Sequence, residues 1–153
     1  MPNVIVSDTS CLILFSKIGE LELIRKVFGN IIITEIVKSE YKDPLPKWIT
    51  VKNPTSKLHK GLELVLDSGE ASSIGLAVEL KDCLLIIDEF KGRRISTELG
   101  ISKTGTLGIL LMAKQKGIVT AIKPLIEKIN TTNFRLSEQL VNKVLILANE
   151  KLE

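Results

Sequence analysis

Short aliphatic runs that alternate with longer helix-like segments constrain the fold of this chain more than any other feature. Three such runs are residues 4–6, 31–33 and 84–87, and all of them consist of Val, Ile or Leu. Apolar runs of this length are typical of strands that are buried on both faces. Strands that alternate with helices form α/β folds with a mostly parallel sheet. The sequence therefore predicts a three-layer α/β/α sandwich with a mostly parallel central sheet.

Helix start and stop signals divide the segments between these runs. Thr34 is expected to cap a helix at 35–41, and Gly29 ends another at 20–28. Ser10 is expected to cap the first helix, and residues 48–51 are expected to form a short edge strand. The remaining helices are predicted at 58–66, 70–80, 93–99, 107–116, from Pro124 and from Ser137.

Length and composition indicate one ordinary globular unit. The chain has 153 residues, of which 44% are hydrophobic and 25% charged, and we expect residues 1–153 to form a single domain. No apolar run is long enough to span a bilayer, and the N-terminus lacks the pattern of a signal peptide. Cys11 and Cys83 lie in apolar segments and are predicted to be buried free thiols, so we expect a cytoplasmic protein without a membrane partner.

Two aspartates follow directly after predicted strands. Asp8 comes after the first run and Asp88 after the run at 84–87. Ligands of open α/β sheets bind beyond the carboxyl ends of the strands. Two carboxylates held close together repel each other unless a proton or a cation intervenes. Hard oxygen ligands of this kind suit Mg²⁺ or Mn²⁺.

Two glutamates complete the candidate metal site. Glu70 lies in the first turn of its predicted helix, where the helix dipole favours a carboxylate, whereas Glu40 lies near the end of its helix, where it does not. Each acid also has a plain structural interpretation: Asp8 as a helix cap, Asp88 as a turn residue, Glu70 as a helix-start acid and Glu40 as a surface residue. Our hypothesis is that the four gather around divalent metal.

Several longer segments carry a family resemblance. Residues 6–13 read VSDTSCLI, with an aspartate followed two residues later by serine. Residues 68–77 read SGEASSIGLA, residues 86–94 read IIDEFKGRR, and residues 104–114 read TGTLGILLMAK. The first segment resembles the opening of PIN-domain proteins. The others are similar to segments of the DUF3368 branch of the PIN-like proteins, so that the resemblance covers nearly the whole chain.

The resemblance implies a PIN-type acidic site at Asp8, Glu40, Glu70 and Asp88, with Glu40 matched by spacing alone. Many toxin-type PIN domains have aspartate where this chain has Glu70. PIN domains are typically Mg²⁺- or Mn²⁺-dependent nucleases, usually of RNA, and such a cluster orients water and stabilises displacement at phosphorus. Asp8 and Asp88 are expected to contact metal directly, and Ser10 is expected to support them through its hydroxyl.

Basic residues near Asp88 are candidates for nucleic-acid binding. Arg93 and Arg94 offer bidentate donors to phosphate, and the alternative is an ion pair with Glu89 or Glu98. The small polar segment 104–108 is interpreted first as a helix cap with close packing, and second as a phosphate contact. His59, the only histidine, is expected at the surface.

The expected partners are an RNA substrate, an antitoxin protein by family analogy, and a second copy of the chain. A haloacid-dehalogenase-type phosphotransferase is disfavoured because its second aspartate is replaced here by Ser10. The second alternative is a catalytically weak or inactive PIN-like protein that binds nucleic acid or a partner protein. Mn²⁺-dependent RNA degradation separates these alternatives.

Overall fold

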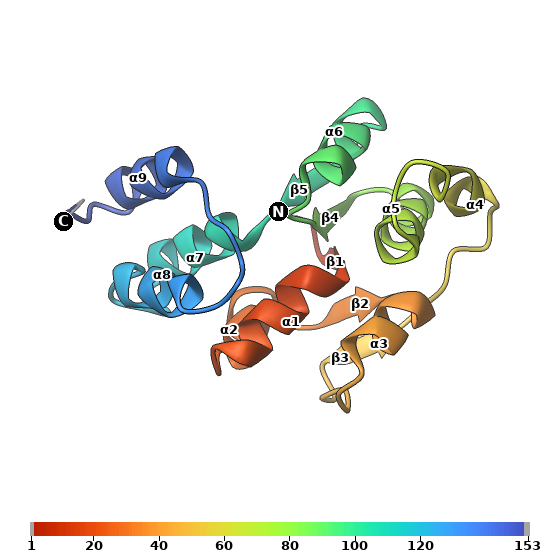
Figure 1. Ribbon diagram of the computed structural model, residues 1–153. Helices are drawn as coiled ribbons and strands as arrows, with labels where there is room; N and C mark the ends of the chain where they lie inside the picture. Colours follow the sequence, from red (N-terminus) through yellow and green to blue (C-terminus); the bar gives the residue numbers. More distant parts are fainter. Residues whose placement is uncertain (1, 152–153) are drawn as a thin grey trace.

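A five-stranded parallel sheet lies at the centre of the computed structural model, which describes residues 2–151 (Figure 1). Its strand order is β3-β2-β1-β4-β5, with every neighbouring pair parallel. The strands are β1 (Val4–Ser7), β2 (Ile31–Ile33), β3 (Ile49–Val51), β4 (Cys83–Ile86) and β5 (Ser102–Thr104). Because β1 and β4 are adjacent, with Ser7 opposite Ile86, the residues that follow them share one edge of the sheet.

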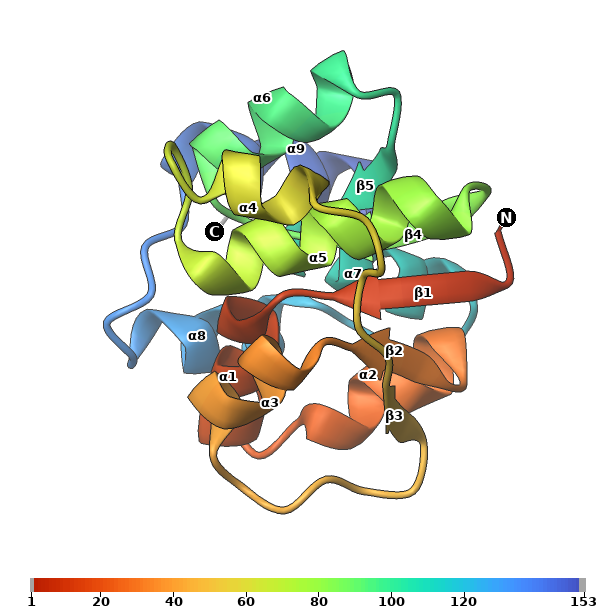
Figure 2. The same cartoon turned by 90° about the vertical axis from the view of Figure 1, so that its right-hand side faces the viewer.

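Helices connect the strands and cover both faces of the sheet, as predicted. They are α1 (Thr9–Lys17), α2 (Leu21–Phe28), α3 (Glu35–Tyr41), α4 (Leu58–Leu62), α5 (Ser68–Leu80), α6 (Phe90–Glu98), α7 (Thr106–Gln115), α8 (Lys123–Asn130) and α9 (Glu138–Leu147). In Figure 1, α4 and α5 lie on one side of the strands and α7, α8 and α9 on the other. Figure 2 shows α5 running across the sheet.

The core has two parts, one on each face of the sheet. Ile5 of β1 packs with apolar side chains of α1, α2 and α7, whereas its neighbour Val6 packs with α5. Successive side chains of a strand point to opposite faces, so an uninterrupted aliphatic strand contributes to both parts. This explains why residues 4–6 of β1, and all of β2 and β4, contain no alternating polar residues. Both cysteines are buried and free, which confirms their prediction.

The main differences from the sequence prediction lie at element ends. Helix α1 begins at Thr9, with Asp8 rather than Ser10 as its N-cap residue. Strand β5 was not predicted, because its residues Ser102, Lys103 and Thr104 include no apolar side chain. Helix α4 ends at Leu62, short of the predicted 66, and α6 begins at Phe90, one turn earlier than predicted.

Other local predictions are confirmed. Thr34 caps α3 by accepting a hydrogen bond from the Val37 N–H, and Ser137 caps α9 in the same way. The predicted edge strand is β3. His59 is half-buried rather than fully at the surface, because it packs against Gly75 of α5.

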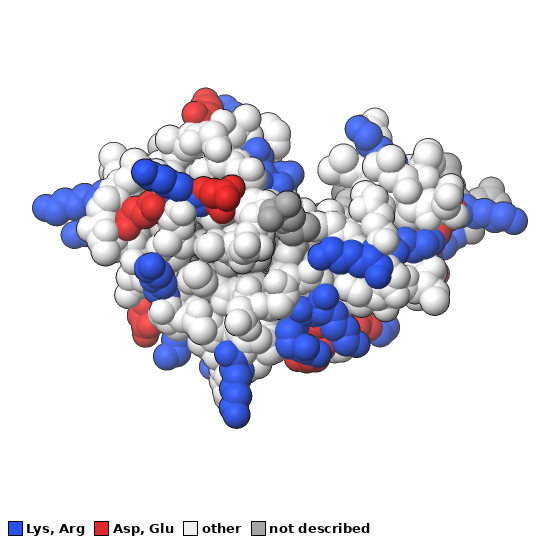
Figure 3. Space-filling view, turned by 180° about the vertical axis from the view of Figure 1, so that it is seen from behind, with Lys and Arg blue, Asp and Glu red and all other residues white. Residues whose placement is uncertain are grey.

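The face of the molecule that is opposite to the view of Figure 1 has mixed charges. Figure 3 views the molecule from behind and shows Lys and Arg side chains scattered over that face, with Asp and Glu among them. No helix within residues 2–151 is long and apolar enough to cross a membrane.

Candidate metal and active site

A cavity of about 360 Å³ is lined by side chains that follow β1 and by side chains of the surrounding helices. Thr9, Ser10 and Ile13 of α1 form one wall. The acidic residues come from five different segments: the end of β1, the last turn of α3, the residue before α5, the first turn of α5, and the residue before α6. They are Asp8, Glu40, Asp67, Glu70 and Glu89. The fold therefore concentrates carboxylates from distant parts of the sequence in one place.

Asp8 is held firmly at the carboxyl end of β1. Its backbone N–H donates to the Ile86 carbonyl at 3.0 Å, which continues the pairing of β1 with β4. The residue is 4% exposed. Burial raises the pKa of Asp8 to about 7; a hydrogen bond from the backbone of Thr9 opposes this rise, and the negative charges of Glu70, Asp67 and Glu40 add to it. A positive charge in the cavity would relieve that cost.

Glu70 is the second buried acid of the cavity. It lies in the first turn of α5, and its backbone N–H donates to Asp67 Oδ1 at 2.8 Å, so that Asp67 caps the helix. The residue is 5% exposed. Burial raises the pKa of Glu70 to about 7, and the neighbouring charges of Asp67 and Glu89 act in the same direction. Two carboxylates at one cavity are thus both destabilised in their charged form.

Glu40 reaches the cavity from the exposed end of α3. Its Oε1 accepts a hydrogen bond from Thr9 Oγ1 at 2.5 Å. The carboxylate lies against the first turn of α5, at Gly69. A carboxylate near a helix C-terminus is unfavourable, but the start of another helix is a favourable place for it. The contact with Gly69 therefore explains why Glu40 is tolerated near the end of α3, where the helix dipole disfavours a carboxylate.

Asp88 makes different contacts from the other three predicted acids. Its Oδ1 accepts from the Thr106 N–H and its Oδ2 from Thr106 Oγ1, both at 2.8 Å. It lines a neighbouring cavity together with Arg93 and residues of α7 and α9. The structure therefore brings Asp8, Glu40 and Glu70 to one cavity, and directs the Asp88 carboxylate to the start of α7.

The two candidate phosphate-binding arginines differ in their surroundings. Arg93 is half-buried and donates from Nη1 to the Ile87 carbonyl at 2.8 Å. Arg94 is exposed. The ion pairs formed within residues 2–151 include neither of them, so the proposed pairing with Glu89 or Glu98 is not seen. Glu89 instead caps α6 by accepting from the Lys91 N–H.

Three residues of the site were missed by sequence reasoning. Asp67 and Glu89 were not predicted as site residues, and Glu89 was considered only as an ion-pair partner of the arginines; in the structure the two residues cap α5 and α6. Thr9 was passed over in favour of Ser10. The spacing of Asp67 three residues before Glu70 was an available signal, since it is the spacing of a cap and the N–H that it binds.

The carboxylates of the cavity are of a chemical type that binds divalent cations, but they lie too far apart to coordinate one as they stand. All the carboxylates of the cavity are hard oxygen donors of the kind that Mg²⁺ and Mn²⁺ bind. Within residues 2–151, however, no three Asp, Glu, His or Cys side chains are grouped closely enough to hold a metal ion. Side-chain rotation toward the cavity centre is therefore needed for metal coordination.

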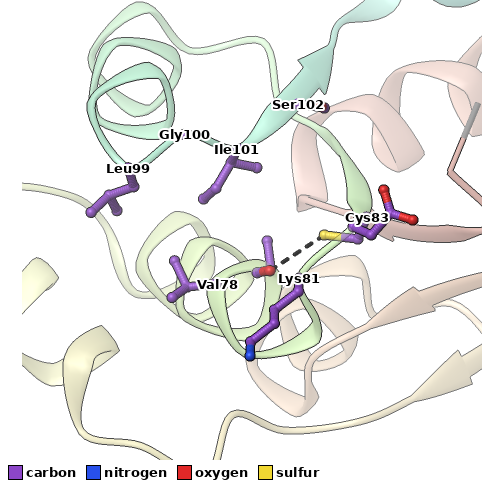
Figure 4. A pocket seen from close by; sticks show the side chains of 9 residues that line it. Val78, Lys81, Cys83, Leu99, Gly100, Ile101 and Ser102 are labelled. Atoms are coloured by element: carbon purple, nitrogen blue, oxygen red, sulfur yellow. Dashed lines mark hydrogen bonds between the residues drawn. The ribbon is translucent and has the colours of Figure 1, made fainter.

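A further cavity, of about 370 Å³, contains no comparable cluster of acids. Figure 4 shows its lining, which includes Val78, Lys81, Leu99 and Ile101. The Cys83 thiol at its wall donates to the Ala77 carbonyl, and burial raises the pKa of this thiol. A protonated, hydrogen-bonded thiol is a poor nucleophile, so this cavity is not a candidate active site.

Comparison with known families agrees with the fold. The DUF3368 family, described as a PIN domain, matches residues 4–150. Neither the curated proteins nor the solved structures include a match to the chain. PIN domains are generally nucleases, and they generally use divalent metals. This chain belongs to the PIN-domain family, in its DUF3368 branch.

Proposed function

We propose that this protein is a divalent-metal-dependent ribonuclease that hydrolyses RNA phosphodiester bonds at the acidic cavity. The observation that carries the proposal is the burial of two acids, Asp8 and Glu70, at one cavity of a PIN fold, both with a pKa raised to about 7. Burial of uncompensated carboxylates is costly for stability, and a cation-binding role explains why they are placed there.

Asp8 and Glu70 would hold the metal most directly, because their carboxylates are the most buried. Glu40, oriented by the Thr9 hydroxyl, would bind through its free oxygen or through water. Asp88 would join after rotation away from Thr106, and Ser10, which lines the same cavity, would orient a bound water. Bound Mg²⁺ or Mn²⁺ supplies an activated water and stabilises charge at phosphorus.

The RNA backbone would approach past the start of α6. Arg94 is exposed and free to contact a phosphate, whereas Arg93 lies beside Asp88 with one nitrogen bound to the Ile87 carbonyl. Arginine binds phosphate through several N–H groups, so Arg93 keeps donors for this purpose. We assign to both arginines a role in holding the substrate.

A second candidate function is binding without turnover, to nucleic acid or to a partner protein. It is favoured by one specific observation: both oxygens of the Asp88 carboxylate accept hydrogen bonds from Thr106, and the residue lines a different cavity from the other acids. If Asp88 does not rotate, only three of the four predicted acids, Asp8, Glu40 and Glu70, remain at the metal site.

The partners that we propose are an antitoxin protein and a second copy of the chain, in a cytoplasmic toxin–antitoxin pair. Helix α9 supports an interface because Leu140, Ile146 and Leu147 are 53%, 62% and 59% exposed. Sedimentation of the wild type and of an Ile146→Glu variant tests self-association through this helix. A wild type that is monomeric at high concentration would exclude the dimer.

The test of nuclease function is cleavage of a fluorescent single-stranded RNA by pure protein with Mn²⁺. We expect cleavage by the wild type and by Glu127→Gln, a control at an exposed position on α8. Asp8→Asn should be inactive, and cleavage that survives this substitution would point to a contaminant. Thermal stabilisation by Mn²⁺ without cleavage would favour the binding function instead.

A further inference from the structure

Glu40 depends on a second element for its position in the cavity. It belongs to the last turn of α3 and is exposed as a residue, so its own helix does not fix its carboxylate. The Thr9 hydroxyl on α1 holds one oxygen, Oε1. The same carboxylate lies against the backbone of Gly69, the second residue of α5.

Gly69 is the position at which this contact is possible. A Cβ atom built at Gly69 would overlap Glu40 Oε1, and its next neighbours would be Glu40 Cδ at 3.1 Å and Oε2 at 3.2 Å. The three nearest atoms thus all belong to one carboxylate. Any side chain at position 69 would occupy the place that the Glu40 carboxylate now fills.

The backbone at Gly69 does not itself require glycine. Among the glycines, positive φ angles occur at Gly19, Gly29, Gly100 and Gly117, and Gly69 is not one of them. Glycine within a helix is less favourable than alanine. Glycine at position 69 therefore lowers the stability of α5 relative to alanine. The space that its missing side chain leaves is filled by the Glu40 carboxylate.

We propose that Gly69 is a positioning residue, whose missing side chain seats the Glu40 carboxylate at the acidic cavity for binding a divalent cation. The inference rests on the proposed metal-binding function and deepens it. The first turn of α5 also offers a favourable electrostatic environment for a carboxylate, which the end of α3 does not. Thr9 thus binds one oxygen of Glu40, and Gly69 leaves the space in which the carboxylate lies.

The first experiment compares Gly69→Ala with Gly61→Ala, a control at a helical glycine that has no atom within 4 Å of a built Cβ. The Glu40 carboxylate is at the end of a flexible side chain, so it can move aside and the fold is retained. We expect Gly69→Ala to weaken Mn²⁺ binding about tenfold, as for losses of residues that orient metal ligands. Its metal-free melting temperature should change little, because the higher helix propensity of alanine offsets the loss of the Thr9 hydrogen bond to Glu40. Gly61→Ala should bind Mn²⁺ as the wild type does.

The same substitution in a Glu40→Ala background separates positioning from general disturbance. With no carboxylate to displace, Gly69→Ala should leave the Mn²⁺ dissociation constant of Glu40→Ala unchanged. An equal weakening in both backgrounds, or no weakening in the wild-type background, would overturn the proposal.

A double-mutant cycle measured without metal distinguishes failure of this inference from failure of the proposed function. Thr9→Val removes the hydroxyl that binds Glu40 and should lower the melting temperature of the wild type by about 3 °C. In the Gly69→Ala background it should have little effect, because the hydrogen bond is already lost. Equal effects in both backgrounds would overturn the positioning role, whereas a wild type that binds no Mn²⁺ would overturn only the metal site.

Discussion

The carboxylates of Asp8 and Asp88 follow neighbouring strands, yet their surroundings give them opposite effects on stability. Asp8 is buried among other acids, and its charge is not matched by a cation within the described residues. Asp88 accepts two hydrogen bonds from Thr106. A buried unpaired charge destabilises a fold, and a charge with good donors stabilises it. The buried, unpaired carboxylate of Asp8 is the arrangement expected of a cation-binding site.

Asp8→Asn should stabilise the metal-free protein at alkaline pH. The folded-state pKa of about 7 lies above the ordinary value of 3.8, so the folded state binds more protons between these values and stability falls as pH rises. Asparagine removes this dependence. We expect the advantage of the variant over the wild type to grow by about 2 kcal/mol between pH 5 and pH 8.

Urea unfolding at pH 5 and pH 8 in the presence of EDTA measures this difference. Glu127→Gln provides the baseline, since Glu127 is exposed on α8. An advantage of Asp8→Asn that stays constant or narrows as pH rises would contradict the burial of an ionised Asp8.

At the scale of elements, the start of α7 depends on a residue from another segment. Its N-cap residue is Gly105, which has no side chain to accept a hydrogen bond, and Asp88 supplies the acceptor for the Thr106 N–H instead. Unpaired N–H groups at a helix start are costly, so Asp88 joins the end of β4 to α7. A built Cβ at Gly105 would lie 2.5 Å from Asp88 Oδ1, so glycine makes room for this carboxylate.

Asp88→Ala should therefore lower the free energy of unfolding, in contrast to Asp8→Asn. Two hydrogen bonds to a charged acceptor are lost, and we expect a cost of about 2 kcal/mol at pH 7. Asp82→Ala serves as the matched control, because Asp82 is exposed just before β4. Equal midpoints of urea unfolding for the two variants would show that Asp88 does not cap α7.

The elements that were predicted correctly are those whose signal is local. Aliphatic runs identified β1, β2 and β4, and cap residues such as Thr34 identified helix starts. Strand β5 was missed because its strand conformation comes from pairing with β4, through Leu84 opposite Ser102, rather than from its own polar residues. Strand pairing of this kind cannot be predicted from the sequence of the segment itself.

The candidate site was predictable in its residue types and less so in its geometry. Asp8 and Glu70 are identified by position and motif, and the structure brings them to one cavity. The contact of Glu40 with Thr9 and Gly69 depends on how α3 approaches α1 and α5, which no local pattern encodes. The orientation of Asp88 likewise depends on the turn before α7.

At the scale of the whole molecule, Glu150 ties the end of the chain to two helices. Its Oε2 accepts from Lys114 Nζ of α7 at 3.0 Å and from the Ile122 N–H at 2.8 Å, and its Oε1 accepts from the Lys123 N–H at 3.1 Å. Burial acts to raise the pKa of Glu150, but these hydrogen bonds outweigh it and the pKa lies below its ordinary value. The residue thereby caps α8 and fixes the segment after α9.

Glu150→Ala should lower the free energy of unfolding by about 2 kcal/mol at pH 7, because three hydrogen bonds to a charged acceptor are lost. Since the folded pKa is lowered, this contribution is present at neutral pH and declines as the pH falls through the folded-state value. Urea unfolding at pH 7 beside Glu127→Ala measures the effect. A loss of unfolding free energy no larger than that of Glu127→Ala would show that the hydrogen bonds of Glu150 do not stabilise the fold.

The central claim is that a divalent cation binds at the cavity of Asp8, Glu40 and Glu70. Calorimetric titration of Mn²⁺ into the metal-free protein at pH 7.5, a value chosen above the raised pKa of about 7, tests it directly. We predict saturable binding by the wild type and by Glu127→Gln, and loss of measurable binding by Asp8→Asn, a variant that remains folded. Unchanged Mn²⁺ binding by Asp8→Asn would contradict the account.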